Sequence, residues 1–324
     1  MTTDTWEQVI TKSAQRVGSW NENFQDSIEW AILQTVAYSD VFDYPLTPGE
    51  IHRNLIGRAT SPESVLQALR YGRWAPRYLT HRNGYYTLPG REAIVDTRQR
   101  RAEIAATMWP KAYYYGKLIA MLPFTKMVAL TGALSVDNVE SEADLDYLIV
   151  TEPGRLWLCR AMVILLVRWA ATHSVIVCPN SFLSETKLVI TRRDLYSAHE
   201  MIQMVPIAGL DVYHRMISLN SWTQEYLPNA HGPSRIEAEP SYSKPFHRLK
   251  DFAEGTLRAP WANGLERWEM NRKVRKFNQR KDWTSEADFC ADWCKGYFDA
   301  HEHRTLTAFA ERLHTIEEMV WLKP

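Results

Sequence analysis

The chain has 324 residues, and 45% of them are hydrophobic, which is enough to build packed cores and excludes an intrinsically disordered protein. It contains 38 lysines and arginines and 38 aspartates and glutamates, so a broadly basic surface for nucleic acid or membranes is excluded, although a local basic patch is not. The length is typical of about two or three domains.

Three features of the sequence favour a soluble cytoplasmic protein without a membrane partner. The first residues, MTTDTWEQVI, lack the basic and then apolar pattern of a signal peptide. The longest apolar run, 161–167, is far too short to span a bilayer and is expected to be a buried helix. Four cysteines in a chain of this size indicate no disulfide framework.

Residues 1–90 have the pattern of a winged helix-turn-helix domain. Apolar residues at helical spacing over 28–36 predict a first helix. The sequence TPGE at 47–50 is a capping box with proline at the first helical position, and SPE at 61–63 opens a third helix in the same way. Asn-Gly within 82–84 stands between alternating apolar residues and predicts a hairpin, which would be the wing.

The function of such a domain is open between two interpretations. Its third helix, 61–71, and the wing could bind DNA or RNA, or the domain could serve only for packing or dimerisation. Arg70 is the single basic residue within that helix, and the chain has no net charge. We therefore treat nucleic acid as a partner that is not favoured.

Residues 91–126 are expected to form a long linking helix between the first domain and a core. Its beginning is basic, with Arg91, Arg98, Arg100 and Arg101, whereas its later part is aromatic and apolar. We interpret the basic cluster as a solvated face, with contact to phosphates as the alternative.

The core, expected over 127–229, starts with a strand, a tight turn, a polar loop and a second strand. The first strand ends at Gly132, and the second carries Asp144 and Asp146 among apolar residues. Because strand side chains alternate between faces, the two aspartates should project side by side. Adjacent carboxylates repel unless solvent, a basic side chain or a divalent cation compensates them, and such an oxygen pair suits Mg²⁺. The alternative is a polar strand end with each aspartate paired locally.

This stretch resembles the signature of the polymerase-β-like nucleotidyltransferases. The matching residues are Leu130, Gly132 and Ala133, a spacer over 134–143, and Asp144-Leu145-Asp146-Tyr147. The likeness is specific over 128–190. A winged-helix-like segment followed by such a core is also similar to a group of bacterial nucleotidyltransferase-like proteins. Ala133 departs from the family, which usually has serine or glycine there to help hold the nucleotide phosphates; Ser135 could supply that hydroxyl instead.

The resemblance implies an α+β fold whose central mixed sheet is covered by helices. It implies Mg²⁺ or Mn²⁺ on Asp144 and Asp146, and an NTP such as ATP near Gly132, Ala133, Ser135 and Asn180. The implied reaction moves an NMP to an unidentified hydroxyl acceptor and releases pyrophosphate.

A third carboxylate in this family often follows the next helix, expected here over 155–172. No aspartate occupies that place, so Asn180 as a neutral ligand and Glu185 as the third acid both stay open. Arg192 and Arg193 could neutralise substrate phosphates. Two non-enzymatic hypotheses remain: a catalytically degenerate core that regulates through nucleotide or nucleic-acid binding by the winged helix, and a module that only dimerises.

The last third of the chain is expected to be a linker, 230–245, followed by a helical C-terminal region, 246–324. A basic segment, 267–281, is interpreted as a solvated helix face, with contact to a polyanion as the alternative. We do not expect zinc at Cys290, Cys294, His301 and His303, because their spacing matches no common zinc module and a continuous helix would separate the histidines. Phosphate-binding loops of the P-loop or Rossmann type are not present in the sequence.

Overall fold

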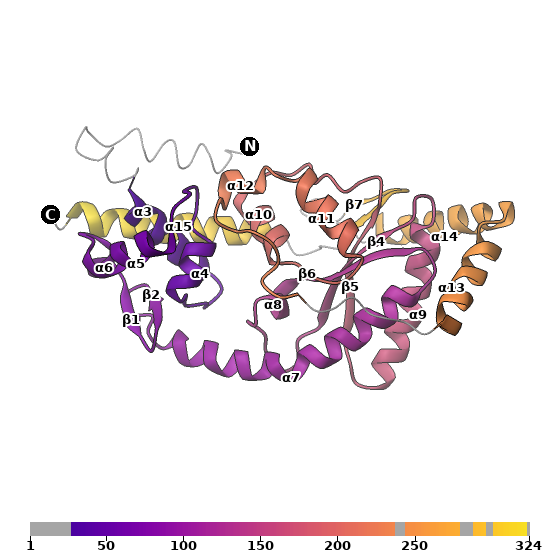
Figure 1. The fold of residues 1–324 in the computed structure, drawn as a ribbon, viewed down its shortest axis with the longest axis horizontal. Helices are drawn as coiled ribbons and strands as arrows, with labels where there is room; N and C mark the ends of the chain where they lie inside the picture. Colours follow the sequence, from indigo (N-terminus) through magenta and orange to yellow (C-terminus); the bar gives the residue numbers. More distant parts are fainter. Residues whose placement is uncertain (1–26, 237–243, 279–287, 296–300, 323–324) are drawn as a thin grey trace.

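The computed structural model describes residues 27–236, 244–278, 288–295 and 301–322. A group of short helices with a hairpin occupies one end of the molecule, a mixed sheet lies toward the other, and the long helix α7 runs along both (Figure 1). None of the described helices combines the length and the apolar composition that crossing a membrane would need.

The N-terminal part contains three principal helices followed by a short helix and a hairpin. Their bounds are α3 Ile28–Asp40, α4 Pro48–Arg53, α5 Pro62–Tyr71, α6 Ala75–Tyr78, β1 Thr80–Arg82 and β2 Tyr85–Thr87. The expected capping box is present, since Thr47 and Glu50 each bond the backbone of the other. The hairpin turns at Asn83 and Gly84, both with positive φ, as a tight Asn-Gly turn requires. Residues 1–26 of the expected first domain lie outside the described residues.

The core of this N-terminal part is completed by segments from much later in the chain. Buried Ile32, Leu33 and Leu69 pack in one cluster with Trp222 and Phe309. Trp222 directly precedes α12 (Thr223–Tyr226), and Phe309 lies within α15 (His301–Leu322). The packing therefore crosses the boundary that the sequence placed at residue 90, because the short N-terminal helices pack on one another and also on these later segments.

Helix α7 covers Ile94–Met121 and connects the two parts. Its basic residues are not simply solvated. Arg98 donates to the Glu50 carboxylate, with Nη1 3.0 Å from Oε2. Arg100 and Arg101 both pair with Glu140, at 2.6 and 2.8 Å. The expected solvated face is therefore wrong for Arg98 and Arg101, whereas Arg100 is exposed. These ion pairs attach α7 to the N-terminal part and to the loop before the strand that carries Asp146.

The central sheet is mixed and has the strand order β6-β3-β4-β5-β8-β7, so the expected α+β architecture is confirmed at this level. Strands β4 and β5 are parallel, and the other neighbouring pairs are antiparallel. The bounds are β3 Thr125–Leu130, β4 Leu145–Thr151, β5 Val177–Ser184, β6 Val205–Ala208, β7 Asp288–Phe289 and β8 Trp293–Lys295. Helix α9, Leu156–Thr172, makes the crossover that parallel pairing of β4 with β5 requires.

Alternating residues of the strands face two separate cores. On β3, Val128 and Leu130 pack in the cluster that contains residues of α7 and α9, such as Trp157. Met127 and Ala129 pack in the opposite cluster. That second cluster includes residues of α10 (Leu195–Gln203) and α11 (Leu210–Leu219). The central strands are therefore largely buried on both faces, and the aspartate pair lies at the start of β4.

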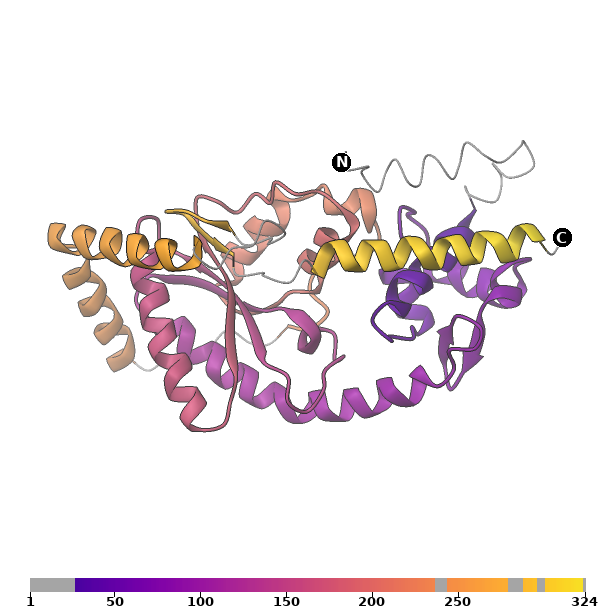
Figure 2. The same cartoon turned by 180° about the vertical axis from the view of Figure 1, so that it is seen from behind.

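The C-terminal region is not wholly helical, which corrects the expectation for 246–324. Helices α13 (Lys244–Leu257) and α14 (Pro260–Asn278) are followed by the hairpin β7–β8, and β8 pairs with β5. Pairing with β8 satisfies backbone groups that β5 would otherwise expose at a sheet edge. Helix α15 then packs on α3, where Arg312 Nε lies 2.7 Å from Asp40 Oδ2. Helices α13 and α14 thus lie at one end of the molecule, and α15 runs toward the other (Figure 2).

Candidate active site

The two aspartates lie where the chain returns into the sheet after β3. Asp144 directly precedes β4, and Asp146 is its second residue. The expected neighbour relation is present, because a carboxylate oxygen of each and the Sγ atom of Cys178 all lie within 4.8 Å of one another. All three side chains are half-buried. Among the described residues this is a group of side chains that could hold a metal ion.

Gly132 lies against Asp146 in a way that no other residue could. Its φ is +68°, and a β-carbon built on it would lie 2.4 Å from Oδ2 of Asp146. The preceding residue, Thr131, donates its backbone N–H to the carbonyl of Asp146 at 2.9 Å. The short helix α8, Gly132–Ser135, follows directly. Glycine is therefore required twice at this turn, once for its conformation and once for the close approach.

The Asp146 carboxyl group is electrostatically unfavourable in its charged form. Burial is the main cause, and the neighbouring Asp144 and then Glu200 add to it, so that the pKa of Asp146 is raised to about 7. Asn180 partly offsets this by donating Nδ2–H to Oδ1 of Asp146 at 2.6 Å. A buried carboxylate beside a second one is the situation that a divalent cation relieves.

Cys178 occupies the place where a third carboxylate was sought. It lies in β5 directly opposite Asp146 in the parallel register. The thiol donates to Oδ1 of Asn180 at 2.9 Å. Burial and the charges of both aspartates raise the pKa of the Cys178 thiol well above its usual range, so it stays protonated. No local pattern points to Cys178, because only the strand register brings it to Asp146.

The residues present fit a hard divalent cation. Asp144 and Asp146 offer carboxylate oxygens, which Mg²⁺ and Mn²⁺ prefer, whereas a protonated thiol offers neither charge nor a hard ligand. Mg²⁺ is commonly bound by one or two carboxylates, with water and substrate phosphates in the remaining positions. A third protein carboxylate is therefore not needed for binding.

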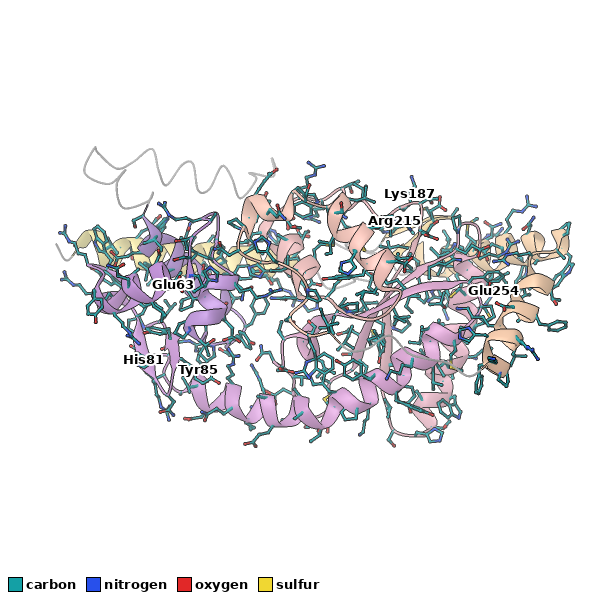
Figure 3. The ribbon with its side chains drawn as sticks, in the orientation of Figure 1. Glu63, His81, Tyr85, Lys187, Arg215 and Glu254 are labelled. Atoms are coloured by element: carbon teal, nitrogen blue, oxygen red, sulfur yellow. The ribbon has the colours of Figure 1, made fainter. Side chains whose placement is uncertain are left out.

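Glu185 is not part of this site. It follows the last residue of β5, whereas Cys178 is near the start, so the two are separated by roughly 20 Å of extended chain. Its carboxylate forms an ion pair with Arg215 of α11, and Figure 3 labels this arginine. The expectation of Glu185 as third acid is therefore wrong, because parallel pairing sends the end of β5 away from the start of β4.

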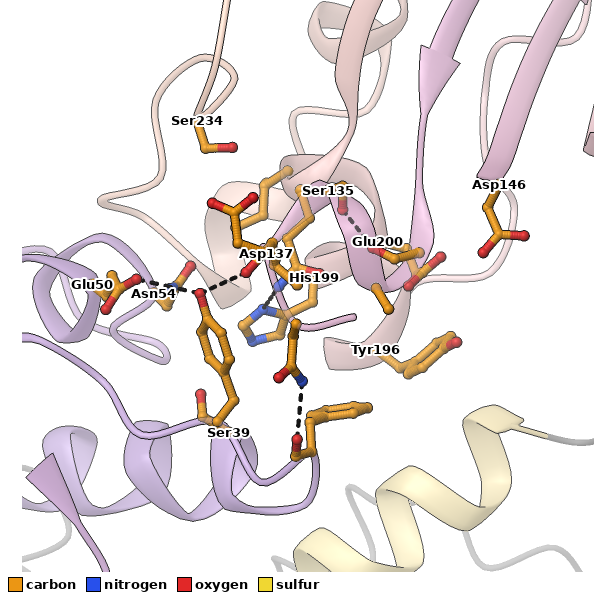
Figure 4. A pocket seen from close by; sticks show the side chains of 18 of the residues that line it. Ser39, Glu50, Asn54, Ser135, Asp137, Asp146, Tyr196, His199, Glu200 and Ser234 are labelled. Atoms are coloured by element: carbon orange, nitrogen blue, oxygen red, sulfur yellow. Dashed lines mark hydrogen bonds between the residues drawn. The ribbon is translucent and has the colours of Figure 1, made fainter. Parts of the chain in front are cut away.

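A cavity of about 690 Å³ opens beside the aspartates. Figure 4 shows Asp146 and Ser135 on one side of it and Glu50 and Asn54 on the other. Its volume lies within the roughly 300–1,000 Å³ of small-molecule sites. The sequence-predicted residues that line it are the following: Gly132, Ala133, Ser135, Asp144, Asp146 and Asn180. Arg192 and Arg193 do not line it, and Arg192 instead pairs with Asp194 and Glu302.

Ser135 does not present a free hydroxyl to this cavity. Its Oγ–H donates to the carbonyl of Gly132 at 2.7 Å, and the residue is buried. The hydroxyl therefore closes the turn of α8. It supports the conformation of Gly132 and does not make the phosphate contact that was expected from the sequence.

The far wall of the cavity comes from elements that the sequence did not connect with the aspartates. Tyr44, in the N-terminal part, donates its hydroxyl to the carbonyl of Val136 at 2.8 Å, directly after α8. On α10, Tyr196, His199 and Glu200 recur at helical spacing and line the cavity. The helical spacing of these three residues can be read from the sequence, but it does not show that α10 faces the end of the sheet where the aspartates lie.

His199 is a buried neutral side chain in this wall. Its ring stacks on Tyr38, with 4.2 Å between the centroids and 10° between the planes. Burial lowers the pKa of His199 to about 3, and its Nε2 atom has no hydrogen-bond partner. The ring therefore fixes α10 against α3 by stacking, and it carries no charge at neutral pH.

Comparisons of the chain with protein-family models, with curated proteins and with solved structures found no match. The family resemblance consequently rests on the residues of 128–190 themselves. The chemistry of the site rests on its geometry: a carboxylate pair on a strand end, a glycine turn against one carboxylate, and an adjoining cavity of substrate size.

Proposed function

We propose that this chain is a divalent-metal-dependent nucleotidyltransferase of the polymerase-β-like type that acts in the cytoplasm. It would move an NMP from an NTP to a hydroxyl acceptor and release pyrophosphate. The observation that supports this most is the contact of Gly132 with Asp146, beside Asp144 and at the edge of a cavity that a nucleotide can enter. A tight backbone approach next to paired carboxylates is what binding of metal-bound phosphates needs.

Each residue of the site has a role in this proposal. Asp144 and Asp146 hold the cation, which when bound neutralises phosphate charge and aligns the reacting phosphate. Asn180 fixes one oxygen of Asp146 at 2.6 Å and so leaves the other for the cation. The Gly132 turn, closed by Ser135, brings backbone groups close to the phosphates. The protonated Cys178 fills the third position without adding charge.

We also propose that α3, α4, α5 and the hairpin β1–β2 form a winged helix. Support comes from the order of the elements and from the Asn83-Gly84 turn. In this protein α4 and the segment before it supply one wall of the cavity, so the domain contributes directly to the substrate site. Arg70 and Tyr71 at the end of α5 are exposed, which keeps nucleic-acid binding by this helix as the alternative, regulatory function.

Calorimetric titration of ATP, GTP, CTP and UTP with Mg²⁺ tests the proposal. Wild-type protein should bind at least one nucleotide only when the metal is present, and Asp144→Asn and Asp146→Asn should abolish this binding. Glu185→Gln is the matched control, because this carboxylate is paired with Arg215 away from the cavity. Nucleotide binding that persists in both aspartate variants would refute the site. Absence of nucleotide binding together with duplex binding that weakens steeply with salt would favour the regulatory alternative.

A further inference from the structure

Helices α13 (Lys244–Leu257) and α14 (Pro260–Asn278) form the end of the molecule opposite the N-terminal helices (Figures 1 and 2). Helix α14 packs along α9. Neither helix lines the cavity beside the aspartates. Their side chains are distributed in an unusual way, which the proposed nucleotidyltransferase reaction does not explain.

The inward faces of these helices are attached through polar side chains. Glu254, labelled at the right of Figure 3, accepts a hydrogen bond from the backbone N–H of Phe124 at 2.9 Å. Glu266 accepts the N–H groups of Trp157 and Leu158, both at 2.8 Å, in the first turn of α9. A carboxylate at a helix N-terminus binds unsatisfied N–H groups and favours the helix dipole. The carboxylates of Glu254 and Glu266 therefore bind the backbone of the core and do not face solvent.

The outward faces carry large apolar side chains instead. Six of them are between 40% and 74% exposed: Phe246, Leu249 and Phe252 on α13, and Trp261, Leu265 and Trp268 on α14. Within each helix they are three or four residues apart, so they follow one another along the surface of that helix. A surface helix of a globular protein normally turns such residues inward. Leu257, Met270 and Val274 still pack against the core, so these helices carry apolar side chains on both faces. Exposed apolar patches of this kind mark interaction sites.

Positive charge is concentrated on the same two helices. Residues 244–276 contain nine lysines and arginines and four carboxylates, although the whole chain is neutral. Three of these carboxylates, Glu254, Glu266 and Glu269, are buried. Arg272 lies over the ring of Trp268 at 5.3 Å from its centroid, and Arg275 and Lys276 follow it on α14 and are exposed. Two of the nine basic residues do not add to the outward charge, because Lys250 donates to the carbonyls of Ala120 and Thr125 and Arg258 pairs with Glu152. The outward surfaces of the two helices remain apolar and cationic through exposed basic residues: Lys244, Arg248, Arg267, Arg275 and Lys276.

We propose that α13 and α14 are a docking surface for an anionic lipid bilayer. Aromatic and leucine side chains beside arginine and lysine are the composition of helices that lie in a membrane interface. Each basic residue near an anionic surface adds about 1 kcal/mol of attraction. A second copy of the chain would bring like charges together, and a nucleic acid would leave the two exposed leucines without a partner. This proposal differs from the expectation of no membrane partner and is independent of the proposed reaction.

Sedimentation of the full chain with lipid vesicles tests this inference. We expect binding to vesicles of phosphatidylcholine mixed with phosphatidylglycerol to be at least about tenfold stronger than binding to phosphatidylcholine alone. Binding should weaken as the salt concentration rises, because the attraction to the lipid head groups is screened. Nucleotide binding measured in the same preparations keeps a failure of this proposal separate from a failure of the proposed function.

Two sets of variants locate the surface. The double variant Trp261→Ser and Trp268→Ser, and separately the pair Arg275→Glu and Lys276→Glu, should each weaken vesicle binding by about tenfold or more. All four side chains are exposed, so folding should be retained. Tyr71→Ser on α5 is the matched control, because Tyr71 is an 80% exposed aromatic at the opposite end of the molecule and should leave binding unchanged.

Four outcomes would overturn the inference. These are no binding to anionic vesicles, equal binding to neutral vesicles, equal weakening by Tyr71→Ser, and sedimentation of the chain alone as a dimer that the tryptophan variants dissociate. Two results together would assign the surface to nucleic acid instead. A single-stranded oligonucleotide would remove the chain from vesicles, and the tryptophan variants would leave vesicle binding intact.

Discussion

A β-carbon on Gly132 would lie 2.4 Å from the Oδ2 atom of Asp146, so the turn after β3 and the carboxylate on β4 exclude any side chain between them. The two residues are joined further by the hydrogen bond from Thr131 N–H to the carbonyl of Asp146. The position of the carboxylate is therefore set by the backbone of the neighbouring strand, which is how a rigid element places a ligand for a metal ion.

Gly132→Ala should weaken both the fold and the metal site. The positive φ costs about 1 kcal/mol for any other residue, and the contact with Oδ2 of Asp146 forces one of the two groups to move. We expect a loss of about 2–4 kcal/mol in the free energy of unfolding and a loss of Mg²⁺-dependent nucleotide binding. Gly57→Ala is the control, since Gly57 has φ +67° but no atom within 4 Å of its added carbon. An equal effect of the two substitutions on stability would show that the contact with Asp146 contributes nothing.

Asp146→Asn should stabilise the metal-free protein at neutral and higher pH. The pKa of Asp146 is raised from 3.8 to about 7, mainly by burial and then by Asp144. The folded state therefore holds a proton that the unfolded state releases, and its stability falls as the pH rises from about 4 through about 7. Above that range the variant should be more stable by about 2–4 kcal/mol. Denaturant unfolding of both proteins measures the difference.

Mg²⁺ should reverse this order. The cation compensates the charged carboxylate in the wild type and has no charged Asp146 to bind in the variant, so it should raise the unfolding midpoint of the wild type only. A wild-type protein that is as stable as Asp146→Asn without metal above about pH 8 would contradict the assigned burial of this charge.

Cys178→Ser should leave Mg²⁺-dependent nucleotide binding within about threefold of wild type. Burial and the two aspartates keep the thiol protonated, and its hydrogen bond to Asn180 can be made by a serine hydroxyl. Calorimetric titration of Mg²⁺ and nucleotide into both proteins measures this. A loss of about tenfold or more would make the sulfur a metal ligand, and the site would then suit a softer cation.

His199 should make the fold sensitive to acid. Burial lowers its pKa from 6.5 to about 3, so the unfolded state binds a proton at a higher pH than the folded state does. Stability is therefore fully retained above about pH 6.5 and is lost as the pH falls toward about 3, by up to about 1.4 kcal/mol per pH unit. His199→Phe keeps the stacking on Tyr38 and should remove this part of the pH dependence.

Unfolding of both proteins at about pH 5 and about pH 7.5 measures the difference, and other titrating groups cancel in the comparison. Equal pH dependence of wild type and His199→Phe would mean that the ring is protonated in the folded state as well.

Local sequence determined the elements that depend on neighbouring residues. The capping box at Thr47 and Glu50 and the turn at Asn83 and Gly84 are present because their hydrogen bonds and backbone angles lie within a few residues. The same holds for Asp144 and Asp146, whose shared direction follows from the alternation of strand side chains. The α+β class and the carboxylate pair could accordingly be predicted.

Tertiary structure alone decided which distant residues meet this pair. The parallel register of β4 with β5 placed Cys178 beside Asp146 and sent Glu185 to the other end of the sheet. The cavity exists because α10 and the N-terminal helices meet at that end, and β8 joined β5 where a helix was expected. Likewise, only the packing of α13 and α14 showed that Glu254, Glu266 and Glu269 point inward while aromatic rings point outward. Such contacts join residues far apart in the chain, and they depend on which faces pack together, which the local pattern of each element leaves undetermined.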